Sequence, residues 1–242
     1  MNGGHVATVI LAYSSFPGQL PAAQRRRLAA ELPHARRSRL GSYGPAHSQS
    51  LLGIALACQL LTRICGRPVS ASQLRFPYGG KPRGRGLPDF SITHAGSWVG
   101  CAVATAGRVG LDLEVLDGAI LPAFGFCFDP QELQQATDAR AALGIWCAKE
   151  ATLKAAGATL AEMRAVSVRG DAAQFRRQRW WVHAPPAPPE LACRLVTDRP
   201  PLALRCERVA WRALCPPPGC RDWQHPGKYR ALLREAVDGQ FA

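Results

Sequence analysis

The stretch Trp146-Cys147-Ala148-Lys149-Glu150-Ala151-Thr152-Leu153-Lys154 has no Gly or Pro and consists largely of residues that favour helices. Glu150 and Lys154 are four positions apart, so on a helix they share one face, and Trp146 lies on that face one turn earlier. A surface ion pair beside an anchoring aromatic residue would give the same pattern. The composition sets the stretch apart, because the chain has 26 Arg and only four Lys, and two of those four lie here.

A second pattern precedes this helix, in residues 109–115. Apolar residues alternate there with Asp112 and Glu114, which predicts a strand with apolar side chains on one face and carboxylates on the other. Two carboxylates on one face, two residues apart, can share a hard cation such as Mg²⁺. A half-exposed strand with its polar side chains in water would show the same alternation.

The remaining pattern predicts helices and strands in alternating groups. We expect helices at 22–32, 45–65, from Asp129 to about 138, from there to about 157, and at 228–237, and strands at 6–13, 90–93, 98–105, 109–115, 166–168, 174–182, 191–197 and 202–211. Residues 76–88 are rich in Gly, Pro and basic residues and predict an irregular loop, which could carry backbone N–H groups and cations to a phosphate. Residues 116–130 are also expected to form a loop.

The totals indicate a globular chain, because 47% of its 242 residues are hydrophobic and 19% are charged. The net charge of +13 favours acidic partners. No zinc-finger, helix-turn-helix or RNA-binding signature supports a nucleic-acid binder, and the Arg residues are spread along the chain. No signal pattern is visible at Met1, and the longest apolar run, Leu51 to Leu61, is too short to span a bilayer, so we expect no membrane association.

The nine cysteines are odd in number and irregularly spaced. This pattern predicts reduced thiols and a cytoplasmic protein. Cys215 and Cys220 bracket Pro-Pro-Pro-Gly, but a zinc site would need a second close pair of ligands.

Four motifs occur in order: Gly80-Lys81-Pro82, Phe90-Ser91-Ile92-Thr93-His94, Val109-Gly110-Leu111-Asp112-Leu113-Glu114 and the helical stretch from Trp146 to Lys154. Together they resemble the motifs of the Sfp-type 4′-phosphopantetheinyl transferases, over about residues 80–157. Each motif is weak alone, but the ordered and correctly spaced set is specific.

The resemblance implies an α+β fold of two similar α/β halves, residues 1–110 and 111–242, related by pseudo-two-fold symmetry. A ligand cleft between the halves would hold coenzyme A, with its nucleotide and 3′-phosphate contacts in the first half and the metal and catalytic helix in the second. Because one chain forms the whole cleft, a monomer is expected.

The resemblance also implies an Mg²⁺-dependent reaction, in which a serine hydroxyl of an apo acyl or peptidyl carrier protein attacks the β-phosphate of coenzyme A. The phosphopantetheine arm is transferred and adenosine 3′,5′-bisphosphate leaves. The carrier, expected to be acidic, could serve fatty acid, polyketide or non-ribosomal peptide biosynthesis.

The resemblance assigns residue roles by motif. The metal ligands would be Asp112, Glu114 and Glu150, and the catalytic residues would be Glu150, as base, and Lys154, which would neutralise the pyrophosphate. Coenzyme A would be bound by Arg36, Arg39, Lys81, Thr93, His94 and Lys154, with Arg37 in the same basic cluster. The role of Lys149, on an adjoining face of the helix, stays open.

The chain departs from the family pattern in two places. Thr93 stands where Ser is usual, which preserves the hydroxyl, and Gln49 stands where an Arg that contacts the nucleotide phosphate is common. The second departure leaves an alternative open: a non-catalytic relative that binds coenzyme A or a carrier protein without transfer.

Overall fold

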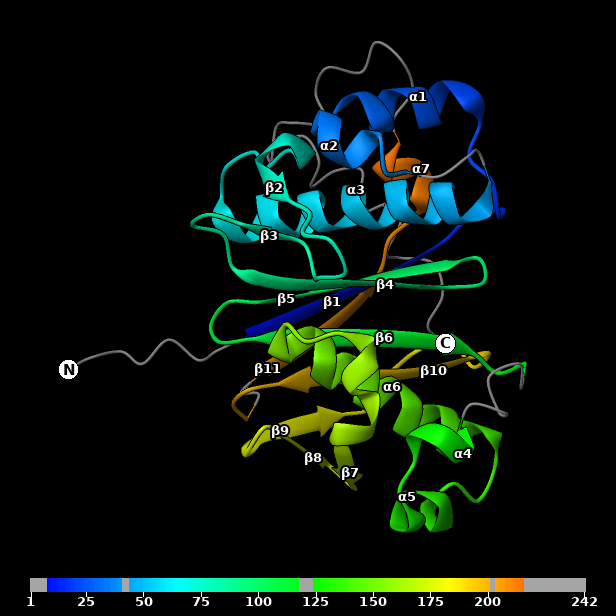
Figure 1. Ribbon diagram of the computed structural model, residues 1–242. Coiled ribbons are helices and arrows are strands. Elements are labelled where there is room, and N and C mark those ends of the chain that lie inside the picture. Colours follow the sequence, from blue (N-terminus) through cyan, green and yellow to red (C-terminus); the bar gives the residue numbers. More distant parts are fainter. Residues whose placement is uncertain (1–7, 41–43, 118–123, 201–202, 216–242) are drawn as a thin grey trace, which may run out of the picture.

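The computed structural model describes residues 8–40, 44–117, 124–200 and 203–215, and two sheets form its centre (Figure 1). The first sheet has the strand order β11-β1-β5-β4 and contains β1 (Thr8–Ser15), β4 (Asp89–Ala95), β5 (Trp98–Ala104) and β11 (Ala203–Arg208). The second has the order β6-β10-β9-β8-β7 and contains β6 (Val109–Val115), β7 (Ser167–Arg169), β8 (Ala172–Phe175), β9 (Gln178–His183) and β10 (Leu191–Thr197).

Helices cover the outer faces of both sheets (Figure 1). Above the first sheet lie α1 (Ala22–Ala30), α2 (His34–Arg37), α3 (Pro45–Cys65) and α7 (Trp211–Leu214); on the second lie α4 (Phe124–Cys127), α5 (Pro130–Gln135) and α6 (Ala139–Ala156). Short 3-10 helices occupy Ala71–Gln73 and Leu160–Ala165, and β2 (Leu74–Arg75) pairs with β3 (Arg83–Gly84). The mixed α+β fold is confirmed, whereas the pseudo-two-fold symmetry and the ligand cleft stay predictions.

Three apolar clusters make up the core of the described residues. One lies between the two sheets and includes Leu11, Leu111 and Leu195. The others lie beneath α3 on the first sheet and beneath α6 on the second. Burying a Leu side chain contributes about 1.5–3 kcal/mol, so these clusters hold the layers together.

Helix α3 supplies most of the core above the first sheet. Pro45 occupies its first turn, and Gly66 ends it in the left-handed conformation, with a φ of 65°. By length and composition this helix could cross a membrane, but 56% of its most apolar window is buried inside the protein, as in the core helix of a globular domain. The helix predicted at 45–65 is confirmed.

Strand β11 links the two parts of the chain. It follows β10 of the second sheet, yet it pairs in parallel with β1 at the edge of the first sheet. The residues after it pack with α3, where Val209 and Leu214 join the core of the first sheet. The division of the chain near residue 110 stays a prediction, and the segment 203–215 lies with the first part.

Several expected elements differ in the structure. Residues 174–182 form two strands, because Arg176 and Arg177 adopt positive φ values of 48° and 61° and turn the chain. Phe124–Cys127 is a helical turn within the expected loop, and Arg83–Gly84 is a strand within the glycine-rich segment. The last described strand ends at Arg208, and a helical turn begins at Trp211. The helix expected at 228–237 and Cys220 lie outside the described residues; none of the described cysteines forms a disulfide.

Polar side chains join the two sheets where the edge strands β4 and β6 meet. The backbone N–H groups of Val109, Leu111 and Leu113 donate to Asp89, Ser91 and Thr93, at 2.8, 3.0 and 3.2 Å. The three acceptors alternate along β4, so they share the face that points to β6. We call this row of side-chain hydrogen bonds the edge ladder.

Gly110 lets β6 and α6 approach closely. A Cβ atom at this position would lie 1.8 Å from the carbonyl oxygen of Ala151, a backbone atom that cannot rotate away. Because Gly110 shares a face of β6 with Asp112 and Glu114, this close contact also sets the distance between those carboxylates and α6.

We expect Gly110→Ala to lower the free energy of unfolding by about 3 kcal/mol, since the added methyl must push helix and strand apart. Urea denaturation measures the change. Gly125→Ala is the matched control, because no described heavy atom lies within 4 Å of its added Cβ. A Gly110→Ala protein as stable as this control would contradict the account of the contact.

Candidate active site

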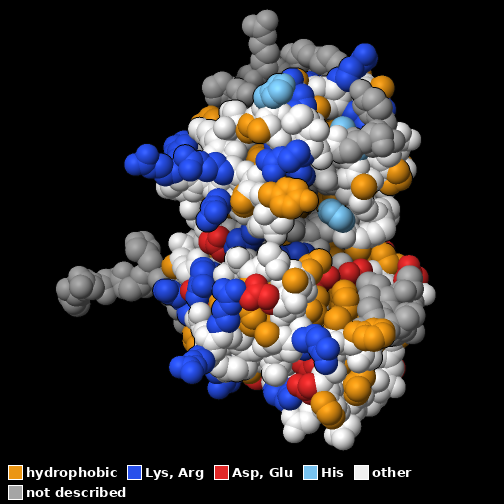
Figure 2. Space-filling model, viewed as in Figure 1, with side chains coloured by type: hydrophobic (Ala, Val, Ile, Leu, Met, Phe, Trp, Pro, Cys, Tyr) orange, Lys and Arg blue, Asp and Glu red, His pale blue; other side chains and the backbone are white. Residues whose placement is uncertain are grey.

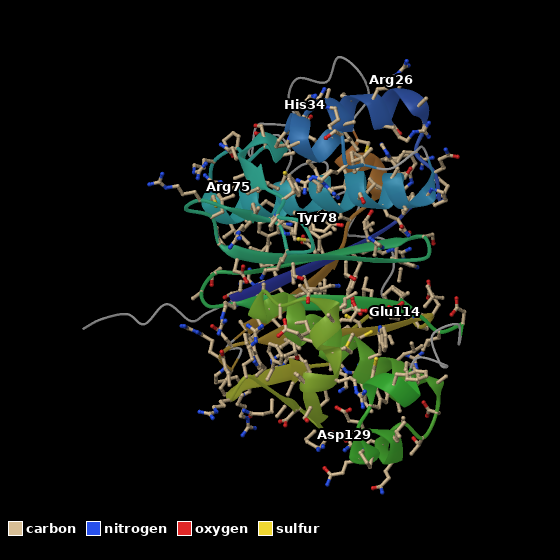
Figure 3. The ribbon with its side chains drawn as sticks, viewed as in Figure 1. Arg26, His34, Arg75, Tyr78, Glu114 and Asp129 are labelled. Carbon is tan, nitrogen blue, oxygen red and sulfur yellow. The ribbon has the colours of Figure 1, made fainter. Side chains whose placement is uncertain are left out.

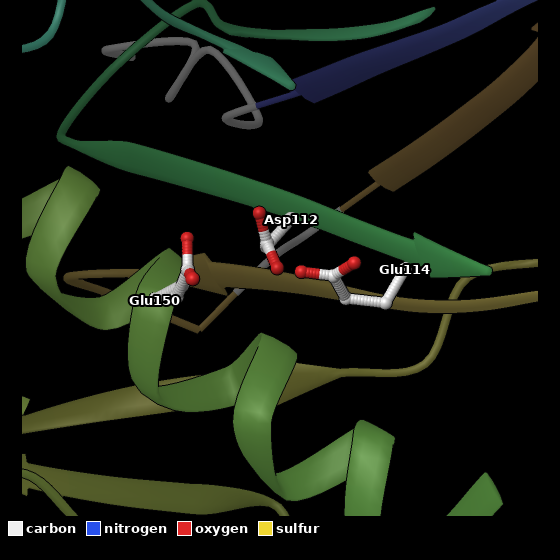
Figure 4. Close-up of side chains that lie close together, drawn as sticks. All are labelled: Asp112, Glu114 and Glu150. Carbon is white, nitrogen blue, oxygen red and sulfur yellow. The ribbon is translucent and has the colours of Figure 1, made fainter. Parts of the chain in front are cut away.

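Three carboxylates from two elements converge at the junction of β6 and α6. Asp112 and Glu114 come from the strand and Glu150 from the helix, and one oxygen from each lies within 4.8 Å of the others (Figure 4). Asp138 caps the start of α6 by accepting from the N–H of Ala141 at 2.8 Å, and Gly157 ends it with a φ of 69°. The structure thus brings together the three residues that the sequence proposed as metal ligands.

The two oxygens of Asp112 have different surroundings. Its side chain is almost fully buried, and Oδ1 accepts from Thr93 Oγ1 at 3.1 Å and from Lys154 Nζ at 2.5 Å. Oδ2 is buried and has no hydrogen-bond partner among the described residues. A buried carboxylate oxygen without a donor is costly, and a cation would compensate for it. The donor set, oxygen atoms from three carboxylates, is the kind that Mg²⁺ prefers.

Glu114 and Glu150 are held near the midpoint of their titration at neutral pH. Burial, followed by the negative charge of Asp112, raises the pKa of each to about 7. The indole of Trp146 faces both carboxylates and favours their charged forms, although its N–H makes no hydrogen bond of normal geometry with the described residues. Trp146 itself packs against Phe124, with ring centroids 5.9 Å apart.

Lys154 is the cation of this cluster. Its Nζ lies 2.5 Å from Asp112 Oδ1, 3.8 Å from a Glu150 oxygen and 3.3 Å from the carbonyl oxygen of Leu111. Burial opposes the charged ammonium, but Asp112 and Glu150 outweigh it and hold the pKa of Lys154 above its usual value. One ammonium does not neutralise three carboxylates, so the site keeps an excess of negative charge when they are ionised.

Lys149 points away from this cluster. It is buried and forms an ion pair with Glu132, at 2.8 Å, and also donates to the carbonyl oxygen of Val166. Glu132 additionally accepts from the N–H groups of Asp129 and Val168, both at 2.8 Å. Removing one partner of such a pair costs about 3–5 kcal/mol, because the other charge is left buried and unpaired, so Lys149 has a structural place between α5, α6 and β7. Sequence reasoning missed Glu132, whose only signal is its place in the capping box of α5.

The residues expected to bind the nucleotide lie in several places. Lys81 is paired with Asp89 at 2.5 Å and donates to the carbonyl oxygen of Val109 at 2.8 Å. Thr93 contacts Asp112, as described above. His94 is exposed. The protein atoms around its ring still remove part of its hydration, which lowers its pKa, and the positive charge of Lys154 lowers it further. His94 therefore lies near the carboxylates with its ring accessible.

Arg36 and Arg39 are not brought to the carboxylates. Arg36 lies over the ring of Phe76, and Arg39 donates to the carbonyl oxygen of the same residue at 2.9 Å. Figure 3 shows His34, at the start of α2, in the upper part of the molecule and Glu114 beside β6 below it. These arginines adjoin the glycine-rich segment, whose Tyr78 is almost fully exposed (Figure 3). Gln49 donates to the carbonyl oxygen of Gly96 at 2.6 Å.

The segment that carries the carboxylates matches a known family. The model of the 4′-phosphopantetheinyl transferase superfamily matches residues 108–202. These residues carry the sequence pattern of that superfamily. The resemblance to the 4′-phosphopantetheinyl transferases is therefore confirmed at the level of the superfamily, and the matched segment contains Asp112, Glu114, Glu150 and Lys154. The Sfp type stays a prediction.

A curated relative agrees with the family match. A Synechocystis sp. protein named "Putative 4'-phosphopantetheinyl transferase slr0495" is 34% identical over 133 residues, which cover 47% of this chain and 51% of the relative. The chain thus spans about half the length of the curated relative it matches.

The raised carboxylate pKa values predict an unusual dependence of stability on pH. Between the ordinary value of 4.5 and about 7, the folded protein binds more protons at Glu114 and Glu150 than the unfolded chain does. In EDTA, these two groups therefore lower the free energy of unfolding as the pH rises through that window. Urea denaturation at several pH values should show a shallower decline for Glu150→Gln than for the wild type. Identical slopes would contradict the raised pKa of Glu150.

Proposed function

We propose that this chain transfers the 4′-phosphopantetheine arm of coenzyme A to a serine hydroxyl of an apo acyl or peptidyl carrier protein, with release of adenosine 3′,5′-bisphosphate. The convergence of Asp112, Glu114 and Glu150 beside Lys154, within the segment that matches the transferase superfamily, carries the proposal. We further propose that the enzyme is Mg²⁺-dependent, monomeric and cytoplasmic.

The three carboxylates are the proposed ligands of the metal. Asp112 Oδ2 has no hydrogen-bond partner among the described residues, so a cation could bind it without displacing a donor. Without metal, Glu114 and Glu150 are partly protonated at neutral pH, and binding of the cation would ionise both. When bound, Mg²⁺ would neutralise charge on the pyrophosphate of coenzyme A.

Glu150 is the proposed base. Its carboxylate would be ionised with the metal bound, and an ionised carboxylate beside the serine hydroxyl can accept its proton. The serine oxygen would form a bond to the β-phosphorus as its proton passes to Glu150, directly or through a water molecule. The bond from that phosphorus to the bridging oxygen would break, and adenosine 3′,5′-bisphosphate would leave with the electron pair.

Lys154 is the proposed partner of the leaving group. Its ammonium is charged at neutral pH and reaches both Asp112 and Glu150, so a pyrophosphate placed beside the carboxylates would come within its range. Phosphoryl transfer depends mainly on positioning and on such charge neutralisation. Arg36, Arg39, Lys81 and His94 are proposed to contact the nucleotide end, for which Lys81 would have to leave its contact with Asp89.

The surface charge fits an acidic carrier. The net charge is +13, and Figure 2 shows Lys and Arg side chains spread over both the helical upper part and the lower part of the viewed face. Such a surface would speed the encounter with an acidic carrier protein and make it sensitive to ionic strength.

We expect Glu150→Gln to abolish carrier loading, because an amide neither accepts the serine proton nor binds the metal as a carboxylate does. The measurement is the mass increase of a panel of apo carrier proteins incubated with coenzyme A and Mg²⁺. Glu162→Gln is the matched control, since Glu162 is paired with Arg176 at the surface and is not one of the three converging carboxylates.

Full loading by Glu150→Gln would overturn the role of Glu150. If the wild type binds coenzyme A tightly but loads no carrier in the panel, the alternative of a non-catalytic binding protein is favoured. One observation favours this alternative. Gln49 stands where the family often has a phosphate-contacting Arg, and its amide donates to the carbonyl oxygen of Gly96.

A further inference from the structure

Thr93 binds both to the backbone of β6 and to the side chain next to it. Its side chain is buried, and Oγ1 accepts from the N–H of Leu113 at 3.2 Å while lying 3.1 Å from Asp112 Oδ1. Because an ionised carboxylate only accepts hydrogen bonds, the hydroxyl proton must point to Asp112. A single hydroxyl therefore couples the backbone position of β6 to the orientation of one carboxylate.

The contacts of Asp112 are divided between its two oxygens. Thr93 and Lys154 both donate to Oδ1, whereas Oδ2 is buried without a partner among the described residues. Figure 4 shows this carboxylate between those of Glu114 and Glu150. Two donors on Oδ1 fix the rotation of the group, so that Oδ2 is the oxygen left for a cation.

The two donors differ in how firmly they are held. The Lys154 ammonium ends a flexible side chain and is shared among Asp112, Glu150 and the carbonyl oxygen of Leu111. Its proposed role at the pyrophosphate would draw it from Asp112. Thr93 is β-branched and stiff about χ1, and its hydroxyl is anchored by Leu113. Its methyl group also packs against Gly100, where an added Cβ would lie 3.3 Å away.

We propose that Thr93 is a positioning residue that holds Asp112 Oδ1, so that Oδ2 is directed to the divalent cation. The inference rests on the proposed function for the presence of that cation. It gives Thr93 a different role from the nucleotide contact expected from its motif, because both hydrogen bonds of its hydroxyl are made within the protein.

Metal affinity tests this role directly. Mn²⁺, used in place of Mg²⁺, can be titrated into the apo protein while electron paramagnetic resonance measures the free ion. We expect Thr93→Val, which keeps the shape and removes the hydroxyl, to raise the Mn²⁺ Kd by about 10–100-fold, the usual effect of losing a group that orients a metal ligand. Thr93→Ser, which keeps the hydroxyl, should bind with a Kd close to that of the wild type.

Ser91→Ala separates positioning from stability. Ser91 accepts from the N–H of Leu111 at 3.0 Å in the same edge ladder, but among the described residues it makes no hydrogen bond to a carboxylate of the site. Its loss should destabilise the fold and leave the Mn²⁺ Kd unchanged. If Thr93→Val does not fold, Thr93→Ala compared with Thr93→Ser gives the same contrast in the hydroxyl.

The outcomes are distinct. A Thr93→Val or Thr93→Ala protein with the wild-type Mn²⁺ Kd, or a Thr93→Ser protein as weak as either, would overturn the positioning role while leaving carrier loading and the metal site in place. A wild type that binds no Mn²⁺ would overturn the inference together with the metal assignment. Carrier loading, measured separately, then decides whether the proposed transfer survives.

Discussion

The free edge of β6 is the constraint on which both the fold and the site depend. An edge strand normally leaves a row of unpaired N–H and C=O groups. Here the edge ladder satisfies the N–H groups of Val109, Leu111 and Leu113, and lysines donate to two of the carbonyl oxygens. Side chains rather than backbone make these bonds, so the two sheets can pack face to face over an apolar layer. Each hydrogen bond contributes about 0.5–1.5 kcal/mol, and an unmade one costs more.

The same edge organises the chemistry. Gly110 brings β6 against α6, which sets Asp112 and Glu114 opposite Glu150. Thr93 and Lys154, which bind the edge, also bind Asp112. Burial and mutual repulsion raise the pKa of both glutamates, so the charged site opposes folding until a cation compensates. Apolar burial in the three core clusters offsets this local cost.

The sequence predicted what depends on local pattern. The alternation at 109–115 and the helix-forming residues up to Lys154 gave the strand and helix of the site, and their motifs gave the family. The partners of single side chains depend on tertiary packing and could not be predicted. The sequence left the role of Lys149 open, and only the structure shows that it enters the core with Glu132, whereas Lys154 meets Asp112. The hairpin turn at Arg176 and Arg177 was missed because positive φ values at such turns usually select Gly or Asn.

Asp112, Glu114 and Glu150 are proposed to form one divalent metal site, oriented by the edge of β6. A crystal soaked in Mn²⁺, as a stand-in for Mg²⁺, tests this most directly through anomalous scattering. We expect one peak bonded to an oxygen of each carboxylate, at about 2.0–2.2 Å, with Asp112 bound through Oδ2 and Oδ1 still on Thr93. A fully occupied Mn²⁺ elsewhere, with these carboxylates free of metal, would contradict it.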